Sequence, residues 1–215
     1  MLNKIKVLNR VVETGVVAVI RGLDAQEAIK IASASLEGGI DILEVTFTVP
    51  KANTVIEKLV NMYGDKAVVG AGTVLDSETA RIAILSGAQF IVGPNFDLEV
   101  AKLCNRYGIP YMAGCMTINE IIKAMEAGTD VIKLFPGSAF GPSMIKDIKA
   151  PLPHVTIMPT GGVSLENVHE WIGNGCIAVG VGGALTASSK TGDYKKISEI
   201  AMQFVEKVKE AREVL

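Results

Sequence analysis

The chain has 215 residues, of which 49% are hydrophobic, 20% charged and only 5% aromatic. This length is typical of one domain, so we treat residues 1–215 as a single unit with a large aliphatic core. The net charge of −2 and the lack of a basic stripe exclude nucleic acid and an anionic membrane as expected partners. Three cysteines without metal-ligand spacing, and no apolar run of signal-peptide or membrane-span type, predict a cytoplasmic protein.

In chain order, the first dozen residues are expected to form a helix that precedes the first strand. Eight short runs rich in β-branched residues then alternate with amphipathic helical stretches. The runs are VVAVIR (16–21), DILEVTF (41–47), AVVGAGT (67–73), QFIVGP (89–94), PYMAG (110–114), DVIKLFP (130–136), VTIMPT (155–160) and CIAVGVG (176–182). Apolar residues at helical spacing predict a last helix over residues 193–212. Strands that alternate with helices indicate βαβ units and a parallel sheet.

Four helix starts carry residues that favour the N-cap position: Asp24, Asp76, Asp97 and Thr117. Asp24 and Thr117 are each followed three residues later by glutamate, the spacing of a capping box. These signals support the alternation of strands and helices, because each of them follows one of the predicted strands.

Eight units without a long interruption predict a single (β/α)₈ (TIM) barrel with an extra N-terminal helix. The main alternative is an open doubly wound sheet, which usually has fewer strands and a Gly-rich turn after the first one. Here the first turn reads RGLDAQE (21–27) and lacks the G-x-G-x-x-G pattern. We therefore favour the barrel.

The active site of such a barrel is expected at the C-terminal ends of its strands. Side chains alternate along a strand, so the aliphatic face of DVIKLFP directs Lys133 into the barrel. The same reasoning directs Glu44 and Thr46 inward on the second strand. With Arg21 and Thr73 on the first and third strands, these residues form the expected inward polar set.

Each inward group suits a chemical role. A desolvated amine can be partly neutral and attack a ketone, which suits Lys133, and Glu44 is placed as general acid/base. Arg21 and Thr73 are candidates to hold a substrate carboxylate. Pro94 and Phe135 are expected as apolar pocket walls. The structural alternative is a simple ion pair between Lys133 and Glu44, because a buried charge without a partner is costly.

Two glycine pairs predict a phosphate pocket at neighbouring strand ends. Thr160, Gly161 and Gly162 end strand seven, and Gly182 and Gly183 end strand eight. In barrels, these two loops commonly bind phosphate through backbone N–H groups. Tight turns are the simpler alternative for either pair alone. The two histidines, His154 and His169, are placed away from the strand ends, so no catalytic metal is expected.

The sequence resembles a known family. The stretches EVTFTVP (44–50), GAGTV (70–74), KLFPG (133–137) and PTGGV (159–163), in this order and spacing, are similar to those of the 2-keto-3-deoxy-6-phosphogluconate and 4-hydroxy-2-oxoglutarate aldolases. The resemblance runs from VVAVIRG (16–22) to VGVGGAL (179–185). It implies a cytoplasmic homotrimer that acts in carbohydrate metabolism of the Entner–Doudoroff type. It also implies an enzyme that needs no metal or organic cofactor.

The resemblance also implies the roles of individual residues. The Schiff-base lysine falls on Lys133, the catalytic glutamate on Glu44 and the carboxylate-binding threonine on Thr73. The pocket wall and phosphate loops fall on Pro94, Phe135, Thr160, Gly161, Gly162, Gly182, Gly183 and Ala184. Two positions depart from some family members, which carry arginine at Thr48 and serine at Ala184. Both departures concern the choice of substrate rather than the chemistry.

The expected reaction is that of a class I aldolase, a carbon–carbon lyase. It would cleave 2-keto-3-deoxy-6-phosphogluconate to pyruvate and glyceraldehyde 3-phosphate. Phosphogalactonate-derived keto acids and 4-hydroxy-2-oxoglutarate, which would give pyruvate and glyoxylate, are further candidate substrates. Two alternatives are another phosphate-binding barrel, such as an isomerase or epimerase, and a non-catalytic protein that binds a phosphorylated metabolite.

Overall fold

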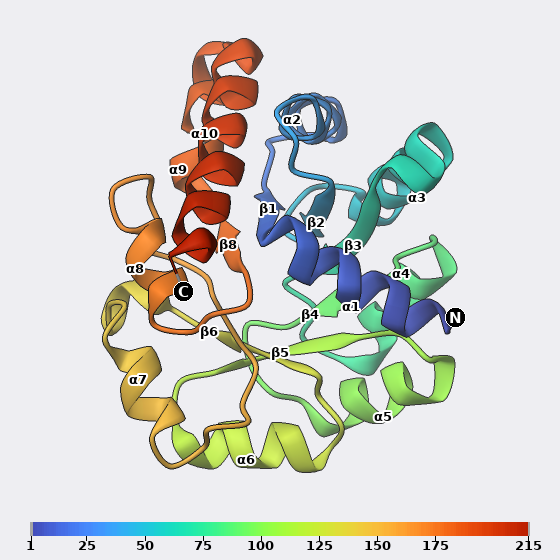
Figure 1. Ribbon diagram of the computed structural model, residues 1–215. Coiled ribbons are helices and arrows are strands. Elements are labelled where there is room, and N and C mark those ends of the chain that lie inside the picture. The colour runs from blue at the N-terminus through green and yellow to red at the C-terminus, as the bar shows by residue number, and fades with distance from the viewer. Residues whose placement is uncertain (1, 215) are drawn as a thin grey trace.

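The computed structural model describes residues 2–214 and contains eight parallel strands surrounded by helices (Figure 1). The strands are β1 (Val16–Ile20), β2 (Ile42–Thr46), β3 (Val68–Gly72), β4 (Ile91–Val92), β5 (Tyr111–Cys115), β6 (Val131–Leu134), β7 (Ile157–Pro159) and β8 (Val179–Val181). The helices are α1 (Asn3–Thr14), α2 (Ala25–Glu37), α3 (Ala52–Tyr63), α4 (Ser77–Leu85), α5 (Leu98–Tyr107), α6 (Ile118–Glu126), α7 (Met144–Lys149), α8 (Val168–Gly173), α9 (Gly183–Thr186) and α10 (Tyr194–Glu213). The 3₁₀ helices are η1 (Gly64–Lys66), η2 (Gly137–Ala139) and η3 (Ala187–Thr191).

The sheet confirms the predicted barrel. Each strand pairs in parallel with its neighbours in sequence, and β1 pairs with both β2 and β8. The β7 and β8 edges meet through a parallel bridge between Thr160 and Gly180, and the Ile177 N–H donates to the Ile157 carbonyl at 3.1 Å. An open doubly wound sheet would have β1 in its middle and two unpaired edges, so that alternative is wrong.

The core has two layers, which follow from alternation along the strands. One cluster fills the inside of the barrel and includes Ile42, Val131, Met158 and Phe90. The larger cluster lies between the strands and the helices and includes Leu43, Val45, Ile132 and Leu134. The side chains of β2 and β6 therefore alternate as predicted. The polar residues Glu44 and Lys133, whose neighbours in sequence face the helices, are directed into the barrel.

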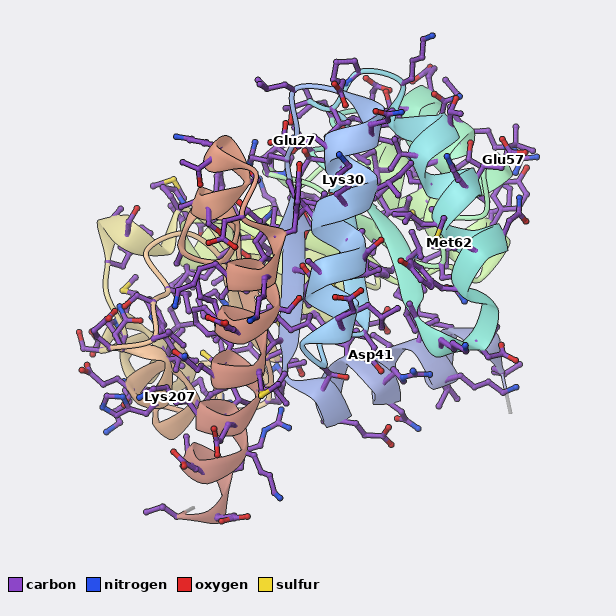
Figure 2. All side chains as sticks on the ribbon, turned by 90° about the horizontal axis from the view of Figure 1, so that it is seen from above. Glu27, Lys30, Asp41, Glu57, Met62 and Lys207 are labelled. Carbon is purple, nitrogen blue, oxygen red and sulfur yellow. The ribbon has the colours of Figure 1, made fainter. Side chains whose placement is uncertain are left out.

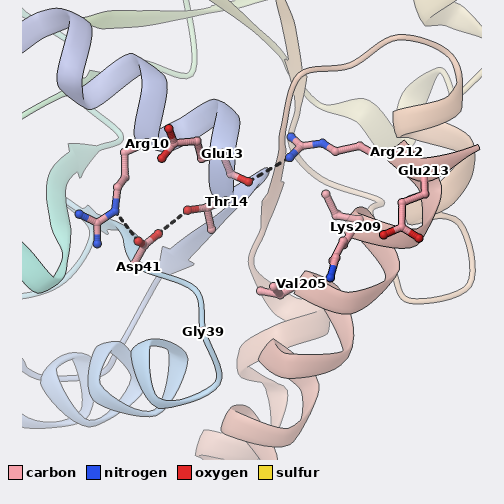
Figure 3. A pocket seen from close by; sticks show the side chains of 10 residues that line it. Arg10, Glu13, Thr14, Gly39, Asp41, Val205, Lys209, Arg212 and Glu213 are labelled. Carbon is pink, nitrogen blue, oxygen red and sulfur yellow. Dashed lines mark hydrogen bonds and ion pairs between the residues drawn. The ribbon is translucent and has the colours of Figure 1, made fainter. Parts of the chain in front are cut away.

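Helix α1 closes the N-terminal end of the barrel, as Figure 1 shows, and Val7 and Val11 pack against the inner cluster. Arg10 holds this helix in place, because its Nε donates to Asp41 at 2.5 Å and its other nitrogens donate to backbone carbonyls at residues 65 and 66. The Thr14 hydroxyl also donates to Asp41 (Figure 3). The predicted N-terminal helix is thus confirmed and acts as a plug.

The four predicted N-cap residues are confirmed, but only one of the two predicted capping boxes forms, because Glu27 of α2 accepts the N–H of Leu23 and not that of Asp24. The side chains of Asp24, Asp76 and Asp97 each accept a backbone N–H from three residues further along, at 2.7–2.8 Å. Thr117 and Glu120 form a complete capping box at the start of α6. Within residues 2–214, no helix is long and apolar enough to cross a membrane.

Candidate active site

Lys133 and Glu44 meet inside the barrel, although their strands are four places apart in the sheet order. Lys133 Nζ lies 3.6 Å from Glu44 Oε1. The Lys133 side chain is 5% exposed and that of Glu44 is fully buried. A buried carboxylate and a buried amine require each other, because an isolated charge would lose its hydration without compensation. The predicted pair is therefore brought together.

The Glu44 carboxylate has spare hydrogen-bonding capacity. Among the described residues, neither of its oxygens has a hydrogen-bond partner, and the contact with Lys133 is longer than a normal N–H···O bond. Orphaned buried acceptors are uncommon, since each costs about 1–3 kcal/mol. Two such oxygens can accept hydrogen bonds from a ligand or a water molecule.

Glycines create the room around this pair. A methyl group on Gly72 would overlap Glu44 Oε1, and one on Gly114 would overlap the backbone of Pro94. Gly114 is also the β5 neighbour of Lys133 in the register. Neither glycine is among the predicted site residues. Both occupy inward positions, where a small residue indicates a close approach of a neighbouring group.

The two predicted wall residues lie close to Lys133. Phe135 lies beside Lys133 itself, and Pro94 lies beside Gly114, the β5 neighbour of Lys133. Lys133 Nζ lies 5.1 Å from the centroid of the Phe135 ring, within the range of a cation–π contact. The loop that carries Pro94 is fixed by Tyr111, whose hydroxyl donates to the Asn95 carbonyl at 3.0 Å and accepts the Asp97 N–H at 3.2 Å. The apolar wall thus rests on a rigid loop.

The orientation predicted for strand three is wrong, although Thr73 does lie at the strand end. The alternation that directs Thr73 inward also directs Val69 and Ala71 inward, but both belong to the outer cluster. Thr73 follows the last strand residue and has φ of 56°, a left-handed conformation that is uncommon outside glycine. This turn breaks the alternation, so the Thr73 side chain has to be placed from the turn and not from the strand.

Thr46 is buried, and its hydroxyl is bonded both to the Ile20 carbonyl at 3.0 Å and to the Thr48 hydroxyl at 2.7 Å. Thr48 itself is exposed at the barrel mouth. Thr48 is therefore tied to the end of β2.

The two glycine loops line one pocket of about 350 Å³, together with Arg21, Phe135 and Thr160. Gly161 and Gly162 both have positive φ, 87° and 75°, which favours glycine. A methyl group on Gly162 would come within 2.7 Å of Ser138 Cα. These glycines are therefore required by the fold, and they also expose the backbone to the pocket.

Polar groups without protein partners face the same region. Gly183 and Ala184 occupy the first turn of α9, where backbone N–H groups have no partner within the helix. The buried Thr160 hydroxyl has no hydrogen-bond partner among residues 2–214. Arg21 is exposed and makes no hydrogen bond or ion pair with the described part of the chain. The pocket thus offers donors to an anion.

Other reactive residues lie elsewhere. His154 and His169 are exposed and outside the pocket. Cys115 belongs to the outer cluster, and burial raises the pKa of its thiol to about 12, so it is a poor nucleophile. In the described residues, no three His, Cys, Asp or Glu side chains are grouped as metal ligands.

Comparisons with known proteins agree with this geometry. The family model for KDPG and KHG aldolases matches residues 7–200. The 2-dehydro-3-deoxy-6-phosphogalactonate aldolase of Escherichia coli K12 is 37% identical over 91% of this chain and 95% of its own length. The 2-dehydro-3-deoxy-phosphogluconate aldolase of Treponema pallidum is 34% identical over 83% of this chain and 86% of its own.

Solved structures show the same fold. A structure described as native KDPGal superposes with a TM-score of 0.86 at 36% identity, covering 92% of this chain and 96% of that one. KDPG aldolase from Legionella pneumophila superposes with a TM-score of 0.82 at 29% identity, covering 90% and 96%. The relatives are named as aldolases, which favours a carbon–carbon lyase over an isomerase or a binding protein. The chain belongs to the KDPG and KHG aldolase family.

Proposed function

We propose that this protein is a class I aldolase that cleaves a phosphorylated 2-keto-3-deoxy sugar acid to pyruvate and glyceraldehyde 3-phosphate, with Lys133 as the Schiff-base nucleophile. The observation that carries the proposal is the buried pair of Lys133 and Glu44, 3.6 Å apart, in which both carboxylate oxygens lack a hydrogen-bond partner among the described residues. A purely structural ion pair would be expected to satisfy its acceptors.

The proposed reaction begins when Lys133 Nζ attacks C2 of the keto acid. Water leaves and a protonated imine forms, which can accept the electron pair of the C3–C4 bond. That bond breaks as the C4 hydroxyl gives its proton to Glu44, directly or through one water molecule. Glyceraldehyde 3-phosphate departs, the enamine takes a proton at C3, and hydrolysis of the imine releases pyruvate and restores Lys133.

Substrate binding is assigned to the remaining predicted residues. In our proposal Arg21 and Thr73 hold the carboxylate, and Pro94 and Phe135 form the apolar wall next to the imine. The backbone N–H groups of Gly161, Gly162, Gly183 and Ala184 take the phosphate, for which the shared pocket of about 350 Å³ and its glycine-lined walls are the support. Gly182 and Thr160 complete this pocket.

Two solved relatives lend support through their bound molecules. The Legionella pneumophila KDPG aldolase was captured with pyruvate as a covalent carbinolamine intermediate. The 2-keto-3-deoxy-6-phosphogluconate aldolase of Zymomonas mobilis, 25% identical with a TM-score of 0.83, was solved with 3-phosphoglycerate. A keto acid bound covalently and a three-carbon phosphate are the two halves of the substrate that we propose here.

The choice between epimeric substrates rests on a comparison of activities. The relatives include phosphogalactonate, phosphogluconate and KHG/KDPG aldolases at 37%, 34% and 30% identity. The last of these makes 4-hydroxy-2-oxoglutarate a second candidate substrate. We also propose a homotrimer in the cytoplasm; one neighbour, at a TM-score of 0.86, is a cage designed by fusing symmetric oligomeric domains, which is compatible with self-association.

Borohydride trapping tests the proposal. The protein is incubated with pyruvate and reduced with sodium borohydride, and the modified peptide is identified by mass spectrometry. We expect one adduct, on Lys133, and none in Lys133→Ala. Lys102→Ala, which removes an exposed lysine, is the matched control and should still be labelled. A folded wild-type protein without an adduct would refute the Schiff-base mechanism. Pyruvate release from the two phosphorylated keto acids in the presence of a chelator then identifies the substrate.

A further inference from the structure

A second cavity adjoins the glycine-loop pocket at the mouth of the barrel. It measures about 570 Å³, and its lining includes Arg21, Leu23, Glu27, Gly183, Ala187 and Lys190. Arg21 and Gly183 line both cavities, so the two spaces share a wall. This wall includes the start of α9, to which we have assigned part of the phosphate site.

Two cations of this cavity are uncompensated. Neither Arg21 nor Lys190 makes a hydrogen bond, ion pair or ring contact with any described residue. The one carboxylate in the lining, Glu27, accepts the N–H of Leu23, which lies just before α2, at 2.7 Å. Lys30, which lies further along α2, differs from Lys190 because its Nζ lies 5.4 Å from the Tyr194 ring centroid. Figure 2 shows Glu27 and Lys30 on α2, with Glu27 nearer the barrel mouth and Asp41 beyond the other end of the helix.

We propose that Lys190 is a specificity-determining residue, whose charge attracts the phosphate end of the substrate and so favours phosphorylated over unphosphorylated keto acids. The inference rests on the proposed function, because it assumes that the phosphate lies against Gly183. A phosphate dianion at that wall would lie between the glycine loops and the cavity that Lys190 lines, and Lys190 is the cation of that cavity to which the proposed function gives no other role.

The charge of Lys190 should affect substrate binding and not the chemical step. Lys190 is exposed, and the cavity that it lines includes neither Lys133 nor Glu44, so we expect its charge to act on bound and approaching substrate alike. Uniform binding of this kind changes KM and leaves kcat unchanged. An attraction between exposed charges also weakens as the ionic strength rises.

The experiment compares Lys190→Gln with wild type on a phosphorylated keto acid and on 4-hydroxy-2-oxoglutarate, at low and high salt. At low salt we expect KM for the phosphorylated substrate to rise about 3- to 10-fold with kcat unchanged, and the unphosphorylated substrate to be unaffected. Lys190→Arg should restore the wild-type KM. Lys195→Gln is the matched control, because it removes an exposed lysine of the same region that lines neither cavity.

Calorimetric titration with glycerol 3-phosphate, which cannot be cleaved, gives a readout that is independent of turnover. We expect weaker binding in Lys190→Gln than in wild type and in Lys195→Gln. Equal losses in both glutamine variants, equal losses on both substrates, or unchanged phosphate affinity would each overturn the role of Lys190. Failure of the proposed function is distinguishable, because the wild-type protein itself would then release no pyruvate from a phosphorylated keto acid.

Discussion

Glu44 Oε1 lies 3.6 Å from Lys133 Nζ, and the two residues reach this distance from strands on opposite sides of the barrel. Their separation therefore depends on the closure of the sheet and not on any local feature of β2 or β6. Both side chains are buried, and Phe135, whose ring lies 5.1 Å from Lys133 Nζ, also lines the glycine-loop pocket, so the pair lies next to that pocket.

Glu44→Gln is expected to keep the imine chemistry possible but to slow proton transfer. The amide is nearly isosteric with the carboxylate but cannot accept the proton of the C4 hydroxyl, so kcat should fall about 10²- to 10⁴-fold. Steady-state pyruvate release measures this loss, and borohydride trapping shows whether the adduct on Lys133 still forms. A variant with a near-normal rate would remove Glu44 from the proposed mechanism.

Gly72→Ala tests whether the space beside Glu44 matters. The new methyl group would overlap Glu44 Oε1, and displacement of the carboxylate by about 1 Å should cost on the order of 10²-fold in kcat/KM. Gly173→Ala is the control, because nothing lies within 4 Å of the corresponding methyl group on α8. Equal activities of the two variants would show that the carboxylate tolerates the shift.

Asp41→Ala is expected to destabilise the fold without changing the chemistry. Asp41 accepts hydrogen bonds from Arg10 and Thr14, which hold α1 under the barrel, as Figure 3 shows. Loss of this partly buried acceptor should lower the free energy of unfolding by about 1–3 kcal/mol, measured by urea denaturation. Glu99→Ala, which breaks the exposed pair with Lys102, should cost less than about 0.5 kcal/mol. A fall in activity that exceeds the loss of folded protein would contradict this separation of roles.

The sequence predicts the barrel well because its eight strands and helix caps are local signals. It also predicts the inward direction of Glu44 and Lys133, since each lies on a strand whose other face is aliphatic. The same reasoning fails in β3, where VVGAG offers small or apolar residues on both faces and Thr73, the next residue, breaks the alternation with a positive φ. The cavity beside Lys190 could not be predicted, because it forms between loops after β1 and β8 that only barrel closure brings together.

The three cysteines are expected to resist alkylation while the protein is folded. Burial raises the pKa of each thiol, at Cys104, Cys115 and Cys176, from 9.0 to about 12. A raised pKa favours the neutral thiol, so at pH 8 the reactive thiolate is on the order of one part in 10⁴. Iodoacetamide at pH 8 should leave the native mass unchanged and retain full activity, whereas the protein unfolded in urea should gain three labels. Because the unfolded thiols ionise near pH 9 and the folded ones only near pH 12, stability should also fall as the pH rises through this interval. Labelling of the native protein at pH 8, measured by intact mass, would show that at least one of these thiols is accessible and ionised in the folded state.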